Sequence, residues 1–86
     1  MNVKITPRFE NDYKYWIKSD KTIIKRILKL IESIKTNPFS GIGKPEALKY
    51  ELQKCWSRRI SYEHRLVYMI IENEIILLSC RFHYPQ

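Results

Sequence analysis

The sequence predicts an α+β fold in which two N-terminal helices pack on one face of a small, twisted, mainly antiparallel sheet. Three observations predict it. Apolar residues recur at helical spacing between residues 7 and 36, and they alternate with polar residues from residue 49 onwards. A third, shorter stretch alternates at residues 2–6. With 86 residues, the chain has the length of one domain, which we assign to residues 1–86.

Residues 2–6 are expected to form a strand because Val3 and Ile5 alternate with polar neighbours. A helix should follow at once, since Thr6 offers a hydroxyl that can cap free N–H groups and Pro7 suits the first helical turn. The large apolar residues of this helix fall on one face, and they are Phe9, Tyr13, Trp16 and Ile17.

The second helix is the clearest element of the sequence. Ser19 and Asp20 end the first helix, and Asp20 can cap the next. Seven Ile and Leu residues between Ile23 and Ile34 recur at helical spacing, while mainly lysines fill the other face. Asn37 and Pro38 end this helix, and residues 38–45 hold both glycines and two of the four prolines, which predicts a loop.

The second half of the chain alternates with a period of two, which predicts strands. The expected strands cover residues 50–52, 56–61, 65–71 and 75–82. The residues from Glu72 to Glu74 form a tight hairpin between the last two. Because the helices cover one face of this sheet, we expect the functional residues on the other face.

The charge of the chain suggests a polyanionic partner. Lys and Arg total 16 against 9 Asp and Glu, a formal charge of +7, which suits nucleic acid, an anionic membrane or an acidic protein. No apolar run approaches the roughly 20 residues that span a bilayer. The first nine residues, MNVKITPRF, lack the apolar stretch of a secretory signal, so we expect no membrane partner and a cytoplasmic protein.

The cysteines and histidines do not form a metal motif. Cys55 and Cys80 are expected to be reduced core residues. Neither they nor His64 and His83 have the close spacing of zinc ligands, so we expect neither a metal nor a cofactor.

Basic residues are concentrated in the predicted sheet. Arg58, Arg59, Arg65 and Arg81 fall on predicted strands, and two lysines, Lys44 and Lys49, lead into them. Alternation places Arg65 on one face with Val67, Met69 and Ile71, and it places Arg81 and His83 on the same face as Ser79. A solvated face is the simple explanation. Arginine nevertheless binds phosphate oxygens better than lysine does, because its planar guanidinium donates two parallel hydrogen bonds, and this favours an anion on that face.

RNA can be cut without a metal when the ribose 2′-hydroxyl attacks the adjacent phosphorus. This reaction needs a base for the 2′ proton, a cation for the charge on the phosphate oxygens, and an acid for the leaving 5′-oxygen. The sequence offers one candidate of each kind, namely Glu46, Arg65 and His83. Taken singly, each also has an ordinary structural explanation, as a solvated carboxylate, a paired arginine and an exposed histidine.

Five motifs occur in order along the chain. They are Asp12–Trp16 (DYKYW), Asn37–Glu46 (NPFSGIGKPE) with Leu48-Lys49, Trp56–Ile60 (WSRRI), Glu63–Tyr68 (EHRLVY) and Cys80–Tyr84 (CRFHY). In this order and spacing, the sequence resembles the YoeB branch of the RelE-like toxin superfamily over nearly its whole length. The resemblance implies a β-α-α-β-β-β, microbial-ribonuclease-like fold.

The resemblance also implies a function. Such toxins cut messenger RNA in the ribosomal A site without a metal, and a YefM-like antitoxin neutralises them; a homodimer is a further implied partner. By similarity Glu46 is the general base, Arg65 stabilises the transition state and His83 is the general acid. Lys49 and Tyr84 hold the phosphate or orient the nucleotide.

The remaining motif residues receive lesser roles. Lys44 and Arg59 are candidates for RNA binding, and Arg58 either contacts RNA or structures the sheet. Trp56 is assigned to the core and His64 to a structural role, since it should face away from Arg65.

Two other functions fit the same residues. A module that binds RNA or the ribosome without cutting would need the charge but not the three reactive groups. A protein-binding component could use the basic face for an acidic partner.

Overall fold

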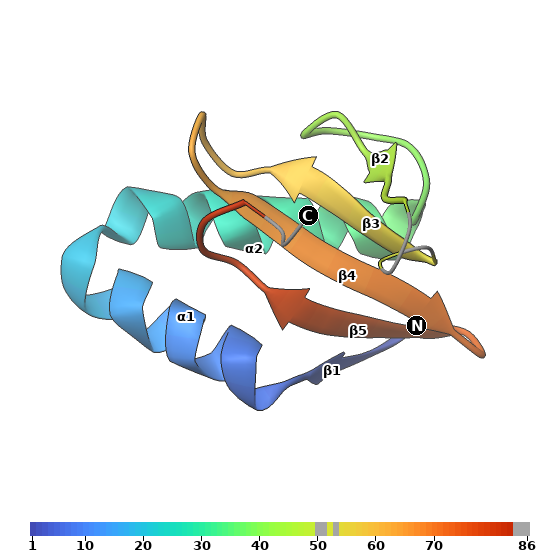
Figure 1. Cartoon of the computed structure of the whole chain (residues 1–86), viewed down its shortest axis with the longest axis horizontal. Coiled ribbons are helices and arrows are strands. Elements are labelled where there is room, and N and C mark those ends of the chain that lie inside the picture. Colours follow the sequence, from blue (N-terminus) through green and yellow to red (C-terminus); the bar gives the residue numbers. More distant parts are fainter. Residues whose placement is uncertain (50–51, 53, 84–86) are drawn as a thin grey trace.

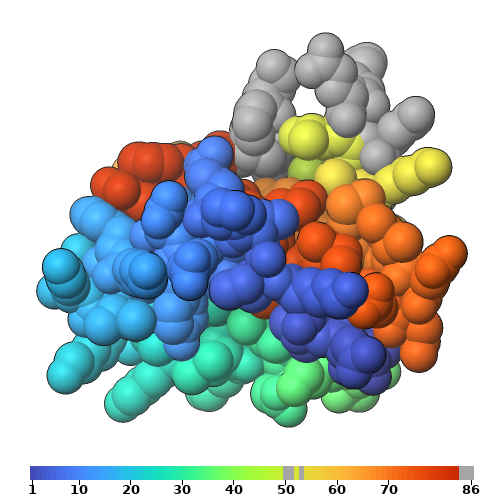
Figure 2. Space-filling view, turned by 90° about the horizontal axis from the view of Figure 1, so that it is seen from below, coloured from blue at the N-terminus to red at the C-terminus, as the bar shows by residue number. Residues whose placement is uncertain are grey.

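The computed structural model describes residues 1–49, 52 and 54–83. Within them, one strand and two helices precede four further strands, and the five strands form one sheet with the order β1-β5-β4-β3-β2 (Figure 1). The elements are β1 (Asn2–Ile5), α1 (Pro7–Ser19), α2 (Lys21–Thr36), β2 (Glu46–Ala47), β3 (Cys55–Arg59), β4 (Arg65–Ile71) and β5 (Glu74–Ser79). Both helices lie on one face of the sheet, and in Figure 2 α2 forms the lower side of the molecule with the strands above it. The predicted α+β class is therefore confirmed.

Both predicted helix starts are confirmed. The Thr6 hydroxyl accepts a hydrogen bond from the N–H of Phe9 at 3.1 Å and donates one to the carbonyl of Leu78 at 2.9 Å. Asp20 accepts from the N–H of Thr22 at 2.9 Å, which caps α2. The Thr6 bonds also fix the start of α1 to β5.

The sheet is antiparallel except at one edge. β1 runs parallel to β5 because the two helices carry the chain back across the sheet before the second half begins. β2, β3, β4 and β5 pair antiparallel in sequence order. The predicted hairpin is confirmed, with Glu72 and Asn73 both at positive φ, 47° and 67°, as a two-residue type I′ turn requires.

Three predicted strand bounds are wrong. The edge strand is Glu46–Ala47 rather than residues 50–52: the N–H of Leu52 bonds to the carbonyl of Lys49 at 3.1 Å in a 3₁₀ turn, while residues 50 and 51 lie outside the described residues. β3 ends at Arg59 instead of residue 61, and β5 ends at Ser79 instead of residue 82. The register shift between Val67 and Tyr68 and the positive φ of Phe82, 65°, mark where alternation stops predicting side-chain direction.

Each face of the sheet has its own apolar cluster. The larger one packs against the helices and includes Leu66 and Tyr68 of β4. The smaller one consists of Leu48, Cys55 and Val67, with Leu52, Met69 and Leu78 beside it. The predicted alternation along β4 is thus confirmed. We call the face opposite the helices the open face, although Leu48 and Leu52 pack against part of it. Both cysteines are buried and unpaired, as predicted.

Candidate functional site

The register of the sheet places Glu46 and Arg65 on the open face. Glu46 pairs with Ser57, which pairs in turn with Val67, and residues that pair directly project to the same side. Two residues further along, Arg59 pairs with Arg65. Glu46 on β2 is therefore two strand spacings, about 10 Å, from Val67 on β4. Arg65 is on the same strand as Val67, about 7 Å further along it. Extended side chains from both positions can reach one group between them.

The guanidinium of Arg65 is held by the β3–β4 loop. Its Nη1 donates to the carbonyls of Ser61 at 2.7 Å, His64 at 3.1 Å and Tyr62 at 3.2 Å. Arg65 is half-buried, and these bonds fix one corner of a group that carries five N–H donors on three nitrogens. The arrangement orients the guanidinium before any anion binds.

His83 follows a segment that is bonded directly to the start of β4. The N–H of Arg65 donates to the carbonyl of Phe82 at 3.1 Å, so the residue before His83 lies against the residue that carries the guanidinium. His83 itself is exposed. Its predicted neighbour in the site, Tyr84, lies outside the described residues.

Three basic residues lie near Glu46 in the chain or on the adjacent strand: Lys44 and Lys49 flank it in sequence, and Arg59 is two residues from its pairing partner Ser57. Lys44, Lys49 and Arg59 are all exposed, as is Glu46 itself. The N–H of Arg59 donates to the carbonyl of Gly43 at 2.7 Å, which fixes the chain just before Lys44 beside β3. Lys44 adopts a positive φ of 51°, so the chain turns there and enters β2 two residues later. Lys44, Glu46 and Arg59 are thereby brought to the β2 edge of the sheet.

Arg58 has a structural role that the sequence left undecided. It is fully buried, and its five N–H donors make five hydrogen bonds, all to uncharged acceptors. These acceptors are the Tyr68 and Ser33 hydroxyls and the carbonyls of Asn37, Ser40 and Ile42. Arg58 therefore organises the loop that leads to Lys44 and Glu46. The signal for this role was strand alternation, since Arg58 must face the helices if Arg59 faces the other way.

The sequence predicts Arg81 on a strand, on the same face as Ser79, but Arg81 lies beyond the end of β5 and that prediction is wrong. Its guanidinium carbon lies 3.5 Å from the ring centroid of Tyr15 on α1 and 4.5 Å from that of Phe82. Because β5 ends at Ser79, the alternation of a strand no longer sets the direction of the following side chains. Arg81 makes cation–π contacts beside α1 instead.

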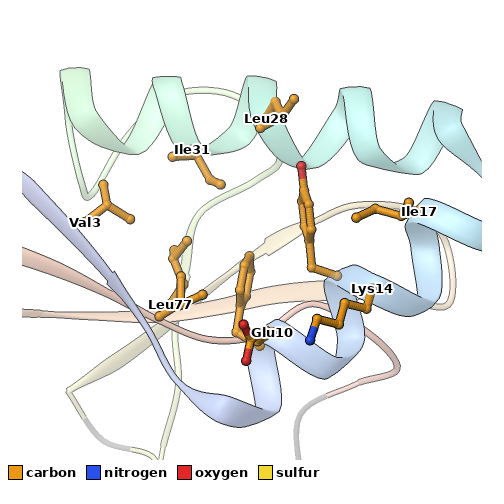
Figure 3. A pocket seen from close by; sticks show the side chains of 10 residues that line it. Val3, Glu10, Lys14, Ile17, Leu28, Ile31 and Leu77 are labelled. Atoms are coloured by element: carbon orange, nitrogen blue, oxygen red, sulfur yellow. The ribbon is translucent and has the colours of Figure 1, made fainter.

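A separate apolar groove of about 360 Å³ lies on the helix side of the sheet (Figure 3). Val3 of β1, Leu77 of β5, and Leu28 and Ile31 of α2 line it. Its only charged lining residues within the described part of the chain are Glu10 and Lys14. The lining is mainly apolar and contains none of Glu46, Arg65 and His83, so this groove is separate from the predicted site.

Neither a metal cluster nor a membrane-spanning helix is present in the described residues. No three side chains of His, Cys, Asp or Glu in that part of the chain lie close enough together to hold a metal ion. Neither helix is long and apolar enough to cross a membrane.

Comparison with known proteins supports the family suggested by the motifs. Residues 5–84 match the family described as YoeB-like toxin of bacterial type II toxin–antitoxin system. Toxin YoeB of Synechocystis sp. is 49% identical over 86 residues, which is the whole of both chains. The structure of the YoeB dimer from Staphylococcus aureus is 46% identical, with a TM-score of 0.90 over 98% of each chain. The YoeB–YefM complex from the same organism is 45% identical, with a TM-score of 0.89 over 98% of each chain. The chain therefore belongs to the YoeB-like toxins of bacterial type II toxin–antitoxin systems.

Proposed function

We propose that this toxin is an endoribonuclease that cuts messenger RNA in the ribosomal A site, without a metal or cofactor. The observation that carries the proposal is the pairing register, which puts Glu46 and Arg65 on one face beside the segment that leads to His83. A carboxylate, a guanidinium and an imidazole at one edge of a basic surface supply the three groups that this reaction needs.

The reaction is a transesterification within the RNA strand. Glu46 takes the proton of the 2′-hydroxyl, and the 2′-oxygen forms a bond to the adjacent phosphorus. The bond from phosphorus to the 5′-oxygen of the next nucleotide breaks, and the imidazolium of His83 donates its proton to that oxygen. The products are a 2′,3′-cyclic phosphate and a 5′-hydroxyl. General acid–base assistance of this kind contributes about 10²–10⁴-fold to a rate.

Arg65 stabilises the negative charge that builds on the non-bridging phosphate oxygens. Since three loop carbonyls already hold its Nη1, little further ordering is needed when the phosphate arrives. The Nε and Nη2 groups then form the edge that meets the phosphate as a two-pronged donor.

The other predicted residues bind the strand rather than react with it. Lys44, Lys49 and Arg59 lie near Glu46 in the chain or on the adjacent strand and contact flanking phosphates. Tyr84 orients the reacting nucleotide. A strand held by several such contacts should bind less tightly as the salt concentration rises.

The partners of the relatives suggest those of this chain. A YefM-like antitoxin would neutralise the toxin by covering the open face around Glu46 and Arg65, since YoeB of Staphylococcus aureus forms a complex with YefM. A homodimer is the second proposed assembly, in line with the YoeB dimer from that organism.

Primer extension on messenger RNA bound to purified ribosomes tests the proposal. The wild-type chain should cut inside codons at the A site, while Arg65→Ala and His83→Gln should slow cutting at least about 100-fold. Lys29→Ala removes an exposed charge from α2, on the far side of the sheet, and should cut at the wild-type rate. Translation arrest with intact transcripts would instead indicate a binding module without catalysis.

A further inference from the structure

The chain between Cys80 and Phe82 is held by side chains from two other elements. On α1, the carboxylate of Asp12 accepts a hydrogen bond from the N–H of Cys80 at 3.0 Å. One turn later, the indole N–H of Trp16 donates to the carbonyl of Cys80 at 2.8 Å. Both residues are buried, so α1 holds the peptide groups on either side of Cys80 by two buried hydrogen bonds.

His64 binds the backbone two residues further along the chain, at Phe82. Its Nδ1 accepts a hydrogen bond from the N–H of Phe82 at 2.7 Å. The imidazole packs edge-on against Trp16, with ring centroids 4.7 Å apart and planes at 81°, and it also lies 5.8 Å from the Phe82 ring. An Nδ1 that accepts must be unprotonated, so His64 is neutral with its proton on Nε2.

Phe82 occupies a backbone conformation that a residue with a side chain seldom adopts. Its φ is 65°, in the left-handed region. Both of its backbone polar groups are engaged there, the N–H by His64 and the carbonyl by the N–H of Arg65. Two consecutive residues of one motif therefore fix the residue that immediately precedes His83.

We propose that His64 is a positioning residue for His83: by accepting the N–H of Phe82 it sets the backbone direction that presents the His83 imidazole beside Arg65. The reason for orienting His83 rests on the proposed ribonuclease function. The hydrogen bond from Phe82 to His64 can be tested without that function. His64 does not touch the RNA in this role. Its contacts are with Trp16 and Phe82.

The electrostatic surroundings favour the neutral imidazole that this role requires. Burial lowers the pKa of His64 below its ordinary value of 6.5, and Arg81, His83 and Arg65 lower it further, against an opposing effect from Glu63. Protonation would turn Nδ1 into a donor that faces another donor. The hydrogen bond to Phe82 is therefore expected to break in acid and to be intact at neutral pH.

The test compares His64→Leu, which removes the acceptor, with His64→Asn, whose side-chain oxygen can take the place of Nδ1. Single-turnover cleavage on the ribosome should show kcat reduced about 10–100-fold in His64→Leu with KM changed less than about threefold, because a small misplacement costs this much. His64→Asn should restore most of the rate. Ile31→Ala, which loosens α2 far from this segment, controls for lost stability alone.

NMR of the free protein provides the second readout. In the wild type and His64→Asn the Phe82 amide should exchange slowly, and in His64→Leu it should exchange quickly and the His83 ring shifts should move. Unchanged amide exchange and His83 shifts in His64→Leu, or a wild-type kcat in that variant below its melting temperature, would overturn the proposal. A wild-type protein that shows the amide protection but cuts no RNA would overturn the ribonuclease function while leaving the hydrogen bond established.

Discussion

Replacing Arg58 with methionine removes five hydrogen bonds from the interior while keeping a side chain of similar length. Each bond contributes about 0.5–1.5 kcal/mol net, so the five together amount to roughly 2.5–7.5 kcal/mol. The lower half of that range is appropriate, because Asn37, Ser40 and Ile42 are exposed and water can reach their carbonyls. We expect a loss of about 3–5 kcal/mol, which is a large part of the stability of a domain this small.

Thermal unfolding followed by circular dichroism measures this loss. For a domain of this size, 1 kcal/mol corresponds to about 4–8 °C, so Arg58→Met should lower Tm by at least about 12 °C. Arg59→Met is the matched control, since it makes the same change at the next residue on the exposed face, and it should shift Tm by only a few degrees. Equal Tm values for the two variants would refute the view that Arg58 holds the loop before Glu46.

Three further results are expected. Gly43→Ala should cost about 1–3 kcal/mol in chemical denaturation, because φ is +83° and a new Cβ would lie 2.6 Å from a methyl of Leu30; a neutral substitution would contradict this packing. Burial raises the pKa of the Cys80 thiol to about 12 and that of Cys55 above its ordinary value, so neither should react with a thiol reagent until denaturant is added. Because the pKa of His64 is lowered on folding, the unfolded chain binds its proton more readily, and the free energy of unfolding should fall as the pH drops below 6.5. The decrease in the free energy of unfolding should be smaller in His64→Asn. An equal decrease in the two proteins would contradict the assignment of this pH dependence to His64.

The helices and the central strands could be predicted from sequence because their signals are local. Thr6 and Asp20 cap helices through their own side chains, and the alternation along β4 is read directly from apolar and polar residues. The signal for the β4–β5 turn was equally local, since the two turn residues themselves, Glu72 and Asn73, adopt the positive φ values that the turn needs.

The ends of the strands could not be predicted because they depend on contacts between distant residues. β5 stops at Ser79 since Asp12 and Trp16 bind the peptide groups of Cys80, 68 and 64 residues away along the chain. No pattern around Cys80 signals those partners. The same contacts explain why Arg81 turns toward α1.

The candidate site was predicted mainly from motifs, and its geometry came from the register. Alternation put Arg65 on the correct face, but only the pairing of Glu46 with Ser57 brings the carboxylate to the same face. Arg58 and Arg59 look alike in sequence, yet one is fully buried and the other is exposed. Their difference follows from which face the helices cover.

The most direct measurement concerns the 2′-hydroxyl that the proposed reaction consumes. A short messenger RNA is placed on the ribosome with a single 2′-deoxy nucleotide at the cut position, and the ends are identified by mass spectrometry. We expect no cutting at that position, and a 2′,3′-cyclic phosphate with a 5′-hydroxyl on the unmodified strand. Cutting of the 2′-deoxy strand at the normal rate, with a 5′-phosphate on the product, would contradict the roles assigned to Glu46, Arg65 and His83.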